Sequence, residues 1–129
     1  MNKLAIILLI TLFASCSSDD DSNTIHKWEH KNSFILLDPD NNIIYNSDEN
    51  YYYMDWTEKE ASDFINMPIA ERILGVEKRE ILSDKINNNK NIKHRIIEIK
   101  MFDINWPSIV NPTLPYIYHK QDIILTRLD

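Results

Sequence analysis

Short apolar runs separated by polar turns predict strands near the start of the folded region. Residues 33–37 and 43–45 are two such runs, and the residues between them read DPDNN. This composition is typical of a tight turn, because proline presets the backbone dihedral φ and asparagine tolerates left-handed conformations. The sequence therefore predicts a β-hairpin over residues 33–46, and the aromatic-rich segment 51–56 predicts a further strand.

Helical spacing of apolar residues follows over residues 57–74. The segment begins with Thr57, and Glu60 three positions later completes the pattern of a capping box. Pro68 interrupts the periodicity, so we expect a kink or two abutting helices. Residues 77–86 predict a second helix. These two segments are the helical part of the expected fold.

The last part of the chain returns to strand patterns. Residues 92–102 alternate apolar and polar side chains and predict a long strand, and residues 122–128 predict a C-terminal strand. Residues 103–120 hold three prolines and no periodic pattern, which favours a long loop. The order of elements predicts one α+β domain over residues 25–129, in which an antiparallel sheet carries one or two helices on one face.

The N-terminus has the pattern of a signal peptide. Lys3 precedes an apolar segment, residues 4–13, and two small residues come directly before Cys16, the only cysteine. This is the layout of a lipoprotein signal, in which the cysteine receives a diacylglyceryl group. The apolar run is too short to span a bilayer, which needs about 20 residues. We expect residues 1–15 to be removed; an ordinary secretory signal with a chance cysteine is the alternative.

Serine and aspartate dominate the residues after Cys16, which read SSDDDS. This stretch resembles the export signal of Bacteroidota-type surface lipoproteins. The resemblance is confined to the N-terminal segment. It implies a lipidated protein of the cell envelope, held in the outer membrane on the periplasmic side or at the cell surface. Residues 16–24 would then be a lipidated polar tether, and two or more acyl chains would anchor the protein stably.

The composition excludes several classes of function. The chain has 20 acidic and 14 basic residues, and this negative balance repels phosphate backbones, so we expect no nucleic-acid partner. Gly75 is the only glycine, which excludes glycine-rich loops that bind phosphates or dinucleotides. Once Cys16 is acylated, no thiol remains for a disulfide, a cysteine metal site or thiol catalysis. We expect no cofactor.

Two segments partly match metal-binding motifs. Residues 26–30, HKWEH, fit H-x-x-E-H, which requires both histidines on one face of a helix and a third ligand from elsewhere. The acidic residues of segment 38–49 follow the spacing of a calcium loop, but Ile43 occupies the position that needs glycine. A polar strand or linker explains the first segment, and a solvated hairpin turn explains the second. We therefore predict no metal site.

Aromatic side chains are the candidates for recognition, because they stack on sugars and dominate binding hot spots. The segment 103–120 is the favoured recognition loop, since its prolines limit the entropy lost on docking. Packing of the same side chains over the core is the alternative. The candidate binding residues are Trp106, Tyr116, Tyr118, Tyr52 and Trp56.

Taken together, these patterns predict a membrane-anchored, non-enzymatic binding or accessory module at the cell envelope, with a protein or glycan ligand. One alternative is an immunity- or inhibitor-type lipoprotein that binds a protein partner. The other is a small glycan-directed hydrolase using carboxylates such as Asp55, Glu58 or Asp63, although nothing in the sequence places two of them at a catalytic separation.

Lipidation is directly testable. Metabolic labelling with palmitate should mark the wild-type protein and should not mark Cys16→Ser, because the thiol is the attachment point for the diacylglyceryl group. Equal labelling of the two proteins would contradict the lipoprotein prediction.

Overall fold

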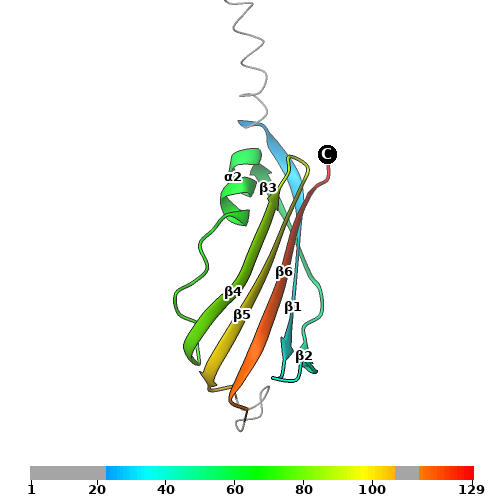
Figure 1. The fold of residues 1–129 in the computed structure, drawn as a ribbon. Coiled ribbons are helices and arrows are strands. Elements are labelled where there is room, and N and C mark those ends of the chain that lie inside the picture. The colour runs from blue at the N-terminus through cyan, green and yellow to red at the C-terminus, as the bar shows by residue number, and fades with distance from the viewer. Residues whose placement is uncertain (1–22, 107–113) are drawn as a thin grey trace, which may run out of the picture.

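The computed structural model describes residues 23–106 and 114–129, where six strands form one antiparallel sheet (Figure 1). The strands are β1 (Ile25–Leu37), β2 (Ile43–Asn46), β3 (Asn50–Thr57), β4 (Val76–Asn88), β5 (Ile92–Ile104) and β6 (Tyr116–Arg127). One helix, α2 (Glu58–Ile65), follows β3 directly within this part of the chain. The predicted signal peptide, residues 1–15, and Cys16 lie outside the described residues.

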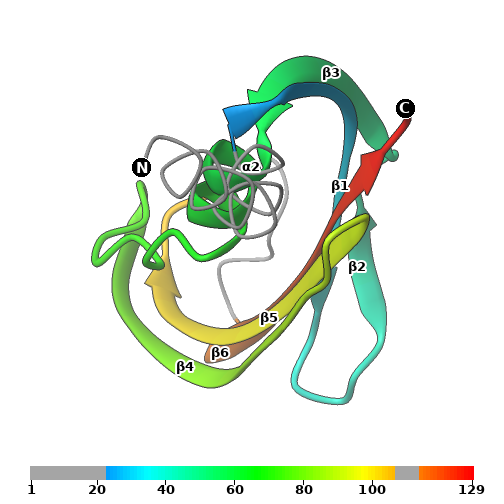
Figure 2. The ribbon, with the colours of Figure 1, turned by 90° about the horizontal axis from the view of Figure 1, so that it is seen from above.

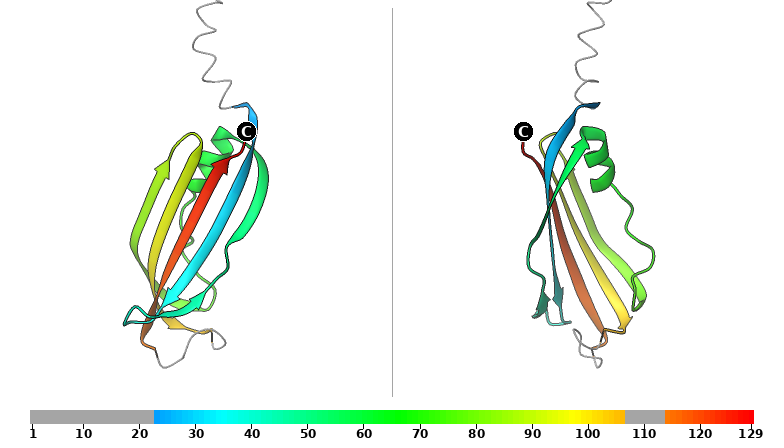
Figure 3. Two further views of the ribbon diagram at one scale, coloured as in Figure 1. Left: turned by 90° about the vertical axis from the view of Figure 1, so that its right-hand side faces the viewer. Right: turned by 180° about the vertical axis from the view of Figure 1, so that it is seen from behind.

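The strand order is β2-β1-β6-β5-β4. Both β2 and β3 pair with the outer edge of β1, β3 along its first half and β2 along its last residues. The sheet is strongly curved, and α2 lies inside the curve (Figure 2). The helix covers the end of the concave face where β1 begins and β6 ends (Figure 3). The rest of that face is left to the segment between α2 and β4.

Alternation along β5 defines the inward face of the sheet. Ile97, Ile99 and Met101 are all buried, which confirms the prediction that they share one face. The alternation continues toward the start of the strand, where Lys93 and Arg95 are also buried. A strand that reads as half polar in sequence therefore places two cations on its core face.

The core consists of two clusters on the concave face. The buried residues of the first are Leu36, Ile97, Ile99, Met101 and Ile117, and those of the second are Trp28, Ala61, Ile65 and Leu125. The second cluster lies under α2, which contributes Ala61 and Ile65. The first lies beyond the reach of the helix.

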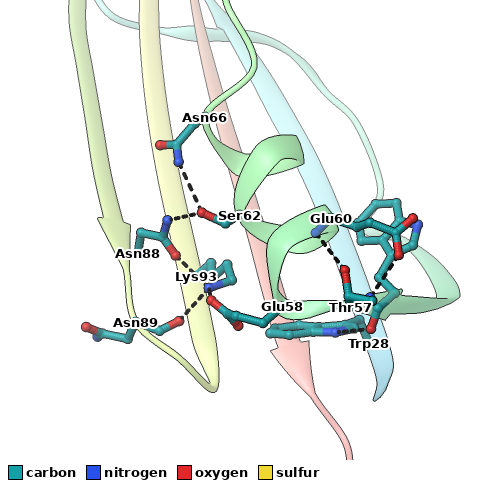
Figure 4. A network of polar contacts seen from close by, with 10 residues as sticks. Trp28, Thr57, Glu58, Glu60, Ser62, Asn66, Asn88, Asn89 and Lys93 are labelled. Atoms are coloured by element: carbon teal, nitrogen blue, oxygen red, sulfur yellow. Dashed lines mark hydrogen bonds and ion pairs between the residues drawn. The ribbon is translucent and has the colours of Figure 1, made fainter. Parts of the chain in front are cut away.

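Lys93 binds the first residue of α2. Its side chain is completely buried, and its ammonium group donates to Glu58 Oε1 at 2.5 Å (Figure 4). It also donates to Asn88 Oδ1 at 2.6 Å and to the carbonyl oxygen of Asn89 at 2.9 Å. All three protons of the ammonium therefore have partners, which offsets the cost of taking the charge out of water.

Arg95 binds the other end of the helix. Its Nη1 donates to the carbonyl oxygen of Ile65 at 3.1 Å, one of the groups that a helix C-terminus leaves without a partner, and to that of Met67 at 2.5 Å, just beyond the helix. Its Nε and Nη2 donate to the two carboxylate oxygens of Asp84 at 2.8 and 2.7 Å. The guanidinium thus links α2 to both β5 and β4.

The predicted capping box is confirmed. Thr57 Oγ1 accepts from the backbone N–H of Glu60 at 3.1 Å, and Glu60 Oε1 accepts from the N–H of Thr57 at 3.0 Å (Figure 4). The indole of Trp28 donates to the carbonyl oxygen of Trp56 at 3.2 Å, just before the helix. These contacts fix where α2 begins.

The predicted antiparallel sheet with a helix on one face is present, but the helical content is much smaller than expected. The first helix covers 58–65 instead of 57–74, and the chain beyond it, with Pro68, is irregular. The predicted helix over 77–86 is wrong, because this segment is the edge strand β4, paired with β5. A bulge between Ile81 and Ser83 resets the alternation of β4, so its sequence lacks a clear two-residue period.

Other strand boundaries also differ. The hairpin predicted over 33–46 is present, but β1 begins at Ile25 and includes the histidine-containing segment. Asp38 Oδ1 accepts from the N–H groups of Asp40 and Asn42, as the turn chemistry predicts. The strand predicted over 122–128 begins at Tyr116, which shortens the predicted loop.

Removing the partner of Lys93 should destabilise the fold. Glu58→Ala leaves a buried ammonium without its carboxylate, so the free energy of unfolding should fall by about 3 kcal/mol in chemical denaturation. Asp63→Ala is the matched control, because Asp63 lies on the same helix in an exposed pair with Lys59 and its loss should hardly change the transition. Equal effects of the two substitutions would contradict the importance of the buried pair.

Candidate functional site

A groove of about 330 Å³ lies on the concave face beyond the end of α2. Its floor is the inward face of β5 and β6, and its outer wall is the segment between α2 and β4. Figure 3 shows the course of that segment from the end of α2 to the start of β4. The floor includes Ile97, Ile99, Met101 and Ile123, and the wall includes Met67, Pro68, Ile69, Ala70 and Ile73. The groove is therefore mainly apolar.

Three side chains on β5 and β6 bring hydrogen-bonding groups to this groove, namely Arg95, His119 and Gln121. Trp106 also lines the groove, but its indole N–H is already bound to the carbonyl oxygen of Leu74. The sheet register sets their positions, because Gln121 lies opposite Ile97 and His119 opposite Ile99 on the neighbouring strand. The amide of Gln121 donates to Asn32 Oδ1 at 3.0 Å. The polar groups thus form a short row beside the apolar floor.

His119 is held as a neutral ring. It stacks on Phe34 with ring centroids 5.0 Å apart, and its Nδ1 is buried with no hydrogen-bond partner among the described residues. Burial lowers the pKa of His119 below its ordinary value of 6.5, because the charged form would be poorly solvated. At neutral pH the ring therefore offers one donor and one acceptor and no charge.

The outer wall is attached to the sheet by three side chains that donate to its carbonyl groups. Arg95 donates to Met67, Arg79 Nε donates to Glu71 at 2.9 Å, and the indole of Trp106 donates to Leu74 at 2.8 Å. These bonds replace the regular pairing that an irregular segment lacks.

Gly75, the only glycine of the chain, is the last residue of this wall before β4 begins. Gly75 has a φ of 79°, a conformation that L side chains rarely adopt. A Cβ added there would lie 2.5 Å from the indole nitrogen of Trp106. Glycine is therefore required twice, by its backbone conformation and by the close approach of the indole.

The structure does not bring the predicted binding residues into one site. Trp106 is half-buried and lines the groove. Tyr116 and Tyr118 alternate with the buried Ile117, so they lie on the convex face. Tyr52 is half-exposed on β3, and Trp56 packs against the cluster under α2.

Sequence reasoning missed most of the groove. His119 was expected within a loop, and Gln121 between that loop and the predicted strand, because the prolines before them masked the start of β6. Residues 117–125, IYHKQDIIL, do not alternate between apolar and polar side chains, so the sequence carries no signal that places both residues on the inward face. No local pattern indicates that the wall packs over β5.

The carboxylates considered for hydrolysis lie in separate ion pairs. Asp55 is 3.8 Å from the ammonium of Lys27, and Asp63 is 2.8 Å from that of Lys59. Glu58 is bound to Lys93. None of the three lines the groove described above.

The two metal-like segments also have other structural roles. Residues 26–30 belong to β1, so Glu29 faces away from His26 and His30, and His30 is buried against Phe64. In segment 38–49, Asp38 stabilises its own turn. Within residues 23–106 and 114–129 no group of three or more histidine, cysteine, aspartate or glutamate side chains is arranged to hold a metal ion.

Comparison of the chain with protein-family models, with curated proteins and with solved structures finds no match. Within the described part of the chain, no helix has the length and apolar character needed to cross a membrane. The groove and its chemistry are therefore the basis for assigning a function.

Acidification should destabilise the protein through its buried histidines. Burial lowers the pKa of His30 and of His119 below 6.5 in the folded protein. As the pH falls below 6.5, the unfolded chain therefore binds more protons than the folded protein does. Stability that is present above pH 6.5 is lost as the pH falls through the folded-state pKa values. Chemical denaturation at a series of pH values measures this loss. The double variant His30→Phe, His119→Phe should show a clearly smaller dependence; an unchanged dependence would exclude these two residues as its source.

Proposed function

We propose that this protein is a membrane-anchored, non-enzymatic binding module that takes a small, mainly apolar molecule into the concave groove. The observation that carries the proposal is the groove itself, which is built largely of apolar side chains and has few polar groups. Small-molecule sites typically have this character and volumes of about 300–1,000 Å³. An apolar cavity of about 150 Å³ holds benzene, so the groove has room for about two fused rings.

The lining side chains support binding rather than catalysis. No carboxylate, hydroxyl, thiol or amine side chain is among the described residues that line the groove. Its one imidazole, His119, has no hydrogen-bonded partner there that would orient it as a general base. Its one guanidinium, Arg95, is already bound to Asp84 and to backbone carbonyls.

The proposed anchor supports a function close to the membrane. A tether over residues 16–24 spans at most about 30 Å even when fully extended, because each residue adds at most about 3.6 Å. The domain would then stay close to the outer membrane, where apolar molecules concentrate. A lipid attached to Cys16 would thus keep the groove near a source of suitable ligands.

Naphthalene is a suitable probe of this function. In the mature, lipidated protein in deuterated detergent micelles, nuclear Overhauser effects should connect its ring protons to the methyl groups of Ile97 and Ile99. Ile97→Trp should abolish the contacts to Ile99, because the indole fills the groove. Ile96→Trp is the matched control, since Ile96 precedes it on β5 and faces the opposite side of the sheet.

These contacts are specific to the groove, so partition of naphthalene into the micelle does not produce them. If the wild-type protein shows no contacts between naphthalene and these methyl groups, the proposed function is contradicted, whatever the variants show. Loss of contacts in both tryptophan variants would indicate that the effect on Ile99 is not caused by filling the groove.

A further inference from the structure

We infer that the ligand of the concave groove is an uncharged molecule with a single hydroxyl group on an apolar body, and that the groove rejects carboxylates of the same size. This inference rests on the proposed function, because it concerns the ligand of the same groove. It follows from the balance of charges and from the hydrogen-bonding groups that remain unused around the floor.

Arg95 is the only charged side chain among the described residues that line the groove, and its charge is already balanced. Two of its N–H groups donate to the two oxygens of Asp84, and two more donate to the carbonyls of Ile65 and Met67. A guanidinium has five N–H groups, so one remains for a ligand. A carboxylate bound there would lie near Asp84 and would bring a second negative charge to one cation.

Among the described residues that line the groove, no other group supplies a compensating positive charge. Lys93 is the next inward cation on β5, but it is paired with Glu58 and does not line the groove. The imidazole of His119 is neutral at pH 7, since burial lowers its pKa. An anion in the groove would therefore lose its hydration shell without gaining an ionic partner, which is strongly unfavourable.

The unused hydrogen-bonding groups match a hydroxyl. Gln121 uses one of its two amide N–H groups on Asn32, and its carbonyl oxygen is an acceptor on the side of the sheet that forms the floor. Arg95 retains one donor, and Nδ1 of His119 has no hydrogen-bond partner among the described residues. A hydroxyl donates one hydrogen bond and accepts others, so it can satisfy an acceptor and a donor together. An ether or a ketone would leave the oxygen of Gln121 without a donor.

Three probes with one ring system test this inference: naphthalene, 2-naphthol and 2-naphthoate at neutral pH. Each is titrated into the mature, lipidated protein, and the methyl shifts of Ile99 give the apparent affinity. We expect 2-naphthol to bind about ten-fold more tightly than naphthalene, which is the effect of one net hydrogen bond, and 2-naphthoate to bind at least about ten-fold more weakly.

The three probes partition differently into the micelle, and two variants control for this difference. Each variant is compared with the wild-type protein in the same detergent, so partition affects both measurements equally. Gln121→Met should abolish the advantage of 2-naphthol, so in this variant the ratio of the 2-naphthol affinity to the naphthalene affinity should fall to about one. Asp84→Asn removes the carboxylate that balances Arg95, so it should raise the affinity for 2-naphthoate at least about ten-fold. Circular dichroism establishes that each variant is folded.

The outcomes separate the two proposals. If naphthalene makes no contact with the groove methyl groups, both the proposed function and this inference are overturned. If naphthalene binds but 2-naphthoate binds equally well, or Gln121→Met leaves the ratio of 2-naphthol to naphthalene unchanged, only the inference is overturned. Should Asp84→Asn fail to fold, the comparison of wild type with Gln121→Met decides the question.

Discussion

Lys93 and Arg95 occupy successive inward positions of β5, and each is bonded to one end of α2. A helix of eight residues is too short to be stable alone in water, so its existence depends on contacts with the sheet. The capping box and the burial of Ala61 and Ile65 contribute, but the two cations determine where the helix lies. Because each cation is fully hydrogen-bonded or nearly so, their burial is tolerated.

The groove is a consequence of how little of the sheet this short helix covers. Beyond Ile65 the chain continues as an irregular wall, held at a distance from the floor by side-chain bonds to its carbonyl groups. Arg95 contributes both to the helix end and to the groove, which couples the shape of the site to the stability of the fold. The same guanidinium is neutralised by Asp84, and this neutrality sets the chemistry of the groove.

The elements that the sequence predicted correctly are those whose patterns span only a few neighbouring residues. The turn at Asp38, the capping box at Thr57 and the alternation of β5 each depend on residues a few positions apart, and each is present in the structure. The strand β4 was mistaken for a helix because it is an edge strand, mostly exposed and bulged, whose conformation comes from pairing with β5. Of the candidate binding residues, only Trp106 lines the groove.

The sequence by itself determined the antiparallel character of the domain, the start of α2 and the absence of glycine-rich phosphate loops, because composition and short-range spacing decide these properties. Only the tertiary structure decided which polar residues turn inward and what they meet. Lys93 and Glu58 are 35 positions apart, and Gln121 and Asn32 are 89 apart. Such pairs form only when curved strands bring distant segments together, so no local pattern could reveal the helix anchors or the polar row of the groove.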